Sequence, residues 1–94
     1  MRARSMTLPD RLDAASARPL ADALLAKRGA PLDLRVGLVE RISTASLQVL
    51  LSAAVTWRVD GHRLRLTGQS PALDESLRIL GLSPDALAAE GNAS

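Results

Sequence analysis

The segment from Ile42 to Val49 holds the residues of this chain best suited to a regulatory or docking role. It brings three hydroxyl side chains, Ser43, Thr44 and Ser46, to the expected start of an apolar helix. Free backbone N–H groups and the positive end of the helix dipole favour a phosphate there. Ordinary helix capping accounts for the same residue types without any modification. The segment therefore predicts a phosphorylation switch or a partner-binding surface rather than a catalytic pocket.

Residues for enzymatic chemistry are scarce in the rest of the chain. His62 is the single histidine and there is no cysteine, which excludes a multi-histidine metal site, a cysteine zinc site and a thiolate nucleophile. The sequence contains no Gly-x-Ser-x-Gly motif for a serine nucleophile. We therefore expect a protein that is not an enzyme and that uses no metal or cofactor.

A second turn, formed by Gly68, Gln69 and Ser70, is a candidate for anion contact. It follows an expected strand and precedes an expected helix, and Ser70-Pro71 is also a common cap-then-proline helix start. The turn lacks the glycine-rich loop and lysine of a P-loop, so nucleotide binding is not predicted. A small enzyme or anion-binding protein built on this turn is the least favoured hypothesis.

The composition limits the classes of partner. The chain has 94 residues, a net charge of +2 and interspersed charges of both signs, which is typical of a solvated surface. Trp57 is its one aromatic residue, whereas readers of single-stranded nucleic acid stack bases on several. No apolar run is long enough to span a bilayer, and the N-terminus does not resemble a signal peptide. We expect a cytoplasmic protein that does not bind nucleic acid or insert into a membrane.

Strand-like and helix-like patterns alternate along the sequence. This order predicts an α/β fold with a mostly parallel sheet of about four strands and three to four helices. The polar alternation of Asp33/Arg35 and Arg63/Arg65 indicates that one face of the sheet stays uncovered, so we expect a small two-layer domain with the helices packed mainly on the other face. We expect a single domain over 1–94, with a core over about 4–82 and a short helical turn and frayed tail over 83–94. The expected strands are 4–8, 32–36 and 63–67, and the expected helices are 14–27, 44–58 and 71–80. Asp13 is the expected N-cap of the first helix, and Ser43 or Thr44 that of the second. For the second helix, the predicted buried stripe is Leu47, Leu50, Leu51, Ala54 and Val55.

Several of these segments together resemble a STAS domain, the module of anti-sigma-factor antagonists, over about 8–82. The segments are Leu12-Asp13-Ala14-Ala15, Leu32-Asp33-Leu34, 42–48, 64–73 and 77–82. The resemblance implies that the central turn is the regulatory site. It also implies that the usual partner is a serine kinase that acts as the anti-sigma factor.

Members of that family commonly carry Asp-Ser-Ser-Gly or Asp-Thr-Ala-Gly at the central turn. Here Ser43 replaces the aspartate and Ser46 the glycine, while Ala45 falls where antagonists carry their phosphorylated serine. Thr44 matches the threonine of the second subgroup. That subgroup includes the small STAS subunit of bacterial phospholipid-transport ABC systems. The run 47–51 with Trp57 and Asp60-Gly61 also resembles the small stand-alone STAS proteins of chemotaxis gene clusters.

The favoured hypothesis is a signalling module that binds a serine kinase or a chemotaxis kinase complex through the start of the second helix. Thr44 is the first candidate phosphoacceptor and Ser43 the second. The alternative is a constitutive subunit of a phospholipid-transport ABC ATPase assembly that uses the same surface unmodified. We expect a monomer or weak dimer. The predicted partner-binding residues are Glu40, Arg41, Ser43, Thr44, Ser46 and Gln48.

Overall fold

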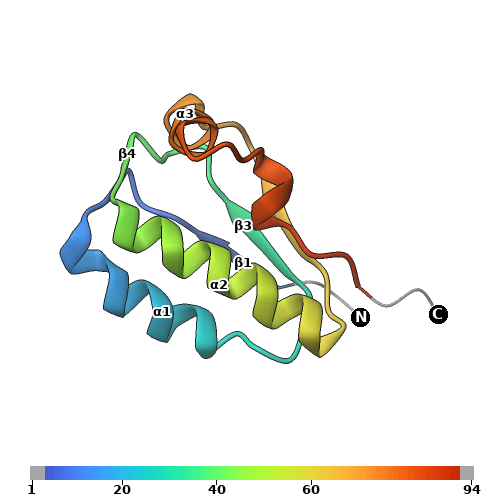
Figure 1. The fold of residues 1–94 in the computed structure, drawn as a ribbon. Coiled ribbons are helices and arrows are strands. Elements are labelled where there is room, and N and C mark those ends of the chain that lie inside the picture. Colours follow the sequence, from blue (N-terminus) through green and yellow to red (C-terminus); the bar gives the residue numbers. More distant parts are fainter. Residues whose placement is uncertain (1–3, 92–94) are drawn as a thin grey trace.

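Three parallel strands form the sheet on which the domain is built (Figure 1). The computed structural model describes residues 4–91. The strands are β1 (Arg4–Thr7), β3 (Leu32–Arg35) and β5 (Leu64–Thr67), and β3 lies in the centre. Because parallel strands need crossover connections, a helix separates each strand from the next.

The helices lie mainly on one face of this sheet, as the polar alternation in its strands predicted. They are α1 (Ala17–Leu25), α2 (Thr44–Asp60) and α3 (Pro71–Ile79), with 3₁₀ turns at Ala14–Ser16 and Pro84–Leu87. Figure 1 shows α1 and α2 side by side in front of the sheet and α3 at its upper end. The α/β prediction is confirmed.

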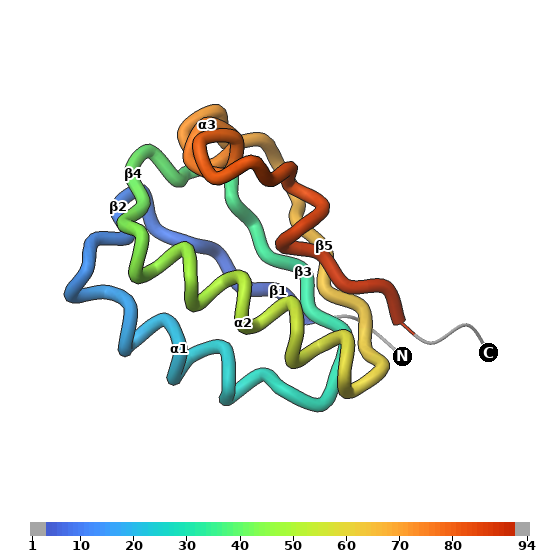
Figure 2. Tube along the Cα trace, viewed as in Figure 1, coloured from blue at the N-terminus to red at the C-terminus, as the bar shows by residue number. Residues whose placement is uncertain are grey.

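Two further strands, β2 (Arg11–Leu12) and β4 (Arg41–Ile42), form a separate parallel ladder. Figure 2 shows them together where the chain enters α2. The described residues thus hold a three-stranded and a two-stranded sheet in place of one sheet of about four strands. Strands of two residues are too short to show the alternation that identifies a strand in a sequence.

The alternation along β3 separates the two faces of the sheet. Leu32 and Leu34 are fully buried under the helices, whereas Arg35 is exposed on the other face. Asp33 lies opposite Arg65 of β5 in the register, and the two side chains form an ion pair of 3.1 Å. This polar face is the one that the sequence predicted to stay uncovered.

The core is centred on α2, which packs against both the sheet and α1. One predicted core position, Val55, is wrong: it is 53% exposed. Val55 lies five residues after the fully buried Leu50, or about 140° around the helix at 100° per residue. The contact with α1 buries the side of α2 that carries Ala53, so Ala53 is in the core and Val55 is not. The buried residues of α2 are Ser46, Leu47, Leu50, Ala53, Ala54 and Trp57.

The chain after α3 belongs to the core, which therefore extends past the predicted limit of residue 82. Leu87 is fully buried and Ala89 is 4% exposed. Ala89 also pairs with Leu64 at the outer edge of β5, through N–H···O bonds of 2.8 and 2.9 Å. The last residues of the predicted frayed tail, 92–94, lie outside the described part of the chain.

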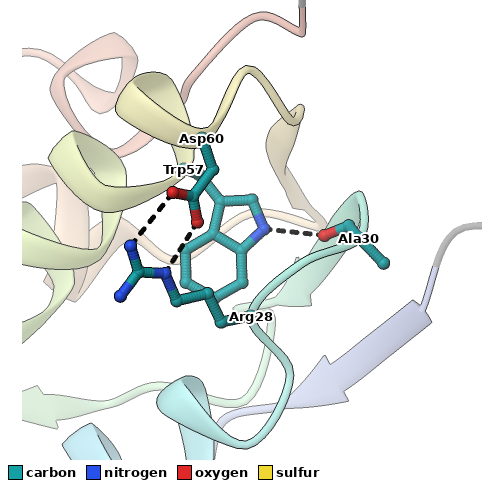
Figure 3. Close-up of polar contacts among 4 residues, drawn as sticks. All are labelled: Arg28, Ala30, Trp57 and Asp60. Atoms are coloured by element: carbon teal, nitrogen blue, oxygen red, sulfur yellow. Dashed lines mark hydrogen bonds and ion pairs between the residues drawn. The ribbon is translucent and has the colours of Figure 1, made fainter.

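A hydrogen-bonded cluster joins the C-terminal ends of α1 and α2 (Figure 3). The indole Nε1 of buried Trp57 donates to the Ala30 carbonyl at 2.9 Å. The Arg28 guanidinium donates to both carboxylate oxygens of Asp60, at 2.7 and 3.0 Å. Hydrogen bonding to Arg28 lowers the pKa of Asp60 below its usual value. Gly61 then ends α2 in the left-handed conformation that glycine adopts most readily, with φ of 74°.

Candidate functional site

Ser43, one of the two residues predicted to cap the second helix, is the N-cap of α2. Its Oγ accepts a hydrogen bond from the backbone N–H of Ser46 at 3.1 Å. Its own backbone N–H donates to the Leu12 carbonyl at 2.7 Å, which attaches the cap to β2. The Ser43 side chain is half-buried. Its hydroxyl therefore has a structural task that a phosphate would disturb.

Thr44 occupies the first position of α2 and is exposed. Its hydroxyl takes part in none of the side-chain hydrogen bonds found among residues 4–91. Ala45 and Gln48 are exposed beside it on the first turns of the helix. Of the three hydroxyls of this segment, that of Thr44 is the one free to meet a partner or a modifying enzyme.

Ser46 lies on the opposite side of the same turn and is fully buried. Its Oγ donates to the Asp13 carbonyl at 2.9 Å, across 33 residues of sequence. The predicted role of Ser46 in contacting a partner does not fit this placement, because its side chain has no exposed surface. The spacing of Ser46 with Leu50 and Ala53, i, i+4 and i+7, is the sequence signal that indicates a buried position.

Glu40 and Arg41 lie exposed at the entrance to α2. Their backbone N–H groups both point to the Asp10 carbonyl, at 2.8 and 3.0 Å, so the segment preceding β2 positions them. The ladder also brings Arg11 opposite Arg41. Arg11 was missed by sequence reasoning, because a two-residue strand carries no signal for its pairing.

The second predicted site, at Gly68, Gln69 and Ser70, has a different geometry. Ser70 is 2% exposed, its Oγ donates to the Val39 carbonyl at 2.7 Å, and it accepts from the Leu73 N–H at 3.1 Å. A Cβ on Gly68 would lie 3.2 Å from the backbone nitrogen of Gly37, and its φ is 82°. Gln69 alone of the three offers an exposed polar side chain. The turn therefore caps α3 and fixes a close approach of two loops, and Ser70 is not available to hold an anion.

An apolar groove of about 330 Å³ runs between α1 and α2. Its lining contains no titratable side chain, so it offers no acid, base or nucleophile activated by one. The lining residues are Ala21, Leu24, Leu25, Gln48, Val49, Ser52, Ala53, Thr56 and Trp57.

Two further features are absent over residues 4–91. No group of three or more histidine, cysteine, aspartate or glutamate side chains is arranged to hold a metal ion in this range. No helix within it is both long enough and apolar enough to cross a membrane.

Comparison with known families identifies the domain. A family model described as "Mlab, STAS domain" matches residues 2–87, which is nearly the whole chain. The chain therefore belongs to this STAS family, as its motifs predicted. No curated protein and no solved structure gives a match.

Proposed function

We propose that this STAS-domain protein is a partner-binding module without catalytic activity, and that its partner contacts the start of α2. The observation that carries the proposal is the exposure of Thr44 at the first position of the helix, with its hydroxyl free. The neighbouring hydroxyls of Ser43 and Ser46 are used within the domain. The proposed surface consists of Glu40, Arg41, Ser43, Thr44, Ala45 and Gln48, and it leaves out the buried Ser46.

The proposed partner is the ATPase subunit of a phospholipid-transport ABC assembly, bound constitutively on the cytoplasmic side. The match to a STAS family supports this partner together with Thr44, which matches the threonine of the subgroup that includes the phospholipid-transport STAS subunit. Ala45 supports it as well, because it stands where STAS antagonists carry their phosphorylated serine and has no hydroxyl to modify. A permanent subunit has no need of a phosphorylation switch.

The test is affinity purification of the tagged full chain from its own cells, with mass spectrometry of the proteins retained. We expect an ATPase and its membrane partners.

Thr44→Glu places a charge at the centre of the surface and is expected to weaken the measured affinity for the purified ATPase by about tenfold or more. Ser83→Glu is the matched control, since Ser83 is exposed, makes no capping hydrogen bond and gains the same charge. Equal affinities of the Thr44→Glu variant and the wild type would refute the proposed surface.

A second candidate function is the phosphorylation-controlled signalling module. The free hydroxyl of Thr44 at a helix N-terminus favours it, because that position accommodates an added phosphate. The partner would then be a serine kinase acting as an anti-sigma factor, or a chemotaxis kinase complex. Phosphate on Thr44, or on Ser43, in protein from its own cells would support this function. Copurification with an ATPase and no phosphate on either residue would exclude it.

A further inference from the structure

Two arginines lie side by side at the entrance to α2, and no carboxylate of the described residues forms an ion pair with either of them. The parallel ladder of β2 and β4 pairs Arg11 with Arg41, and both are exposed. The following residues of the two strands point into the core: Leu12 is 2% exposed and Ile42 packs against the buried cluster. Because side chains alternate along a strand, Arg11 and Arg41 share the outer face, with backbones about 4.8 Å apart.

Like charges directly opposite each other in a ladder destabilise it. Over residues 4–91 neither arginine is in an ion pair; the pairs formed are Arg28–Asp60, Arg65–Asp33 and Arg78–Glu75.

Three carboxylates lie near these arginines in sequence. The Asp13 carboxylate accepts from the Ser16 backbone N–H and hydroxyl, at 3.0 and 2.9 Å. Asp10 and Glu40 each precede one arginine and are exposed, and neither forms an ion pair with Arg11 or Arg41 within residues 4–91. The two guanidinium groups therefore face solvent as a cation pair, here called the Arg11/Arg41 pair.

We infer that the Arg11/Arg41 pair receives an acidic segment of the partner protein, whose aspartate or glutamate side chains lie between the two guanidinium groups. This inference rests on the proposed function, because Arg41 belongs to the proposed partner-binding surface. The strand that holds it, β4, leads through Ser43 directly into Thr44. A guanidinium offers several N–H donors in a planar fork that matches a carboxylate. A carboxylate placed between two like charges relieves their repulsion as well as pairing with each. The pair thus specifies the chemistry of the partner: an acidic patch opposite the start of α2.

The direct test uses an oligoglutamate peptide as the probe and the isotope-labelled full chain observed by NMR. We expect the backbone amides and guanidinium N–H signals of residues 11 and 41 to shift most, and the shifts to shrink as salt rises from about 0.05 to 0.5 M. The double variant Arg11→Gln/Arg41→Gln should lose the response. Equal shifts with an oligoglutamine peptide, or shifts centred on the open sheet face at Arg35 and Arg65, would overturn the inference.

A second measurement separates this inference from the proposed function. The affinity of the captured ATPase for the double variant is expected to fall about tenfold, while the control Arg18→Gln/Arg63→Gln, which changes two exposed arginines outside the ladder, keeps wild-type affinity. If Thr44→Glu weakens binding and the double variant does not, the surface stands and the acidic segment is refuted. If neither variant changes binding, both proposals fail.

Thermal unfolding checks that lost binding is not lost folding. Because neutralising Arg41 removes a repulsion, Arg41→Gln is expected to unfold at the wild-type temperature or slightly above it while it binds less well. A lower unfolding temperature for Arg41→Gln would show that the arginine stabilises the ladder, and that would overturn the inference.

Discussion

Replacing Ser70 with alanine tests whether the turn before α3 is structural. The substitution removes the capping bond to the Leu73 N–H, which is worth about 1 kcal/mol. It also leaves the Val39 carbonyl without the hydroxyl that donates to it at 2.7 Å, which costs about 1–3 kcal/mol in a buried site. We expect Ser70→Ala to lower the free energy of unfolding by about 2–4 kcal/mol, or the melting temperature by on the order of 10–20 °C.

Urea unfolding followed by tryptophan fluorescence measures this loss, because Trp57 is the single tryptophan and is 1% exposed. Ser43→Ala is the matched control: Ser43 also caps a helix, but its hydroxyl makes the capping bond and no bond like that of Ser70 to Val39. The control should lose about 1 kcal/mol. If Ser70→Ala costs no more than Ser43→Ala, with the slope of the urea transition unchanged, the contribution assigned to the Val39 bond is refuted.

Three further predictions concern α2 and its C-terminal end. Trp57→Phe should lower the free energy of unfolding by about 2–4 kcal/mol, because it leaves the Ala30 carbonyl without its hydrogen-bond donor and opens a gap in the core. Circular dichroism in urea measures the loss, and a value under about 1 kcal/mol would contradict the prediction. Asp60→Asn should lower the urea midpoint at pH 7 and match the wild type in acid. Arg28 lowers the pKa of Asp60 in the folded state, so the ion pair stabilises the fold at pH values above the pKa of Asp60 in the unfolded chain. This stabilisation is lost as the pH falls through the folded-state pKa. A difference in urea midpoint between variant and wild type that does not change with pH would argue against the prediction. Val55→Glu should change stability by no more than about 0.5 kcal/mol, because that side chain is exposed; a larger loss in the same assay would place Val55 in the core.

Features set by local chemistry could be predicted from the sequence. The caps at Asp13, Ser43 and Ser70 depend on a hydroxyl or carboxylate reaching an N–H three residues on, and all three form such bonds. The parallel order of the sheet also followed from the alternation of elements.

Features set by contacts between distant segments could not be predicted. The spacing of Ser46 with Leu50 indicates a buried position, but nothing near Ser46 in sequence encodes the bond of its hydroxyl to the Asp13 carbonyl. Ala53 is buried and Val55 is exposed because α1 packs on the side of α2 that carries Ala53. Leu87 belongs to the core because the last 3₁₀ turn contacts α2 and β5. In each case the deciding neighbours belong to other helices, strands or turns of the fold, well separated along the chain.

The central position of β3 has a consequence for how the chain is made. Both neighbours of β3 lie far from it in sequence, since Leu32 pairs with Arg4 on one side and with Leu64 on the other. During synthesis β1 can join β3 early, but the second edge of β3 stays open until α2 and β5 have left the ribosome. In that interval the apolar face of β3, with Leu32 and Leu34, lacks its helix cover and its last hydrogen-bonding partner. An open strand edge beside apolar side chains favours pairing with other chains, so the aggregation risk is greatest between the emergence of β3 and the emergence of β5 from the ribosome.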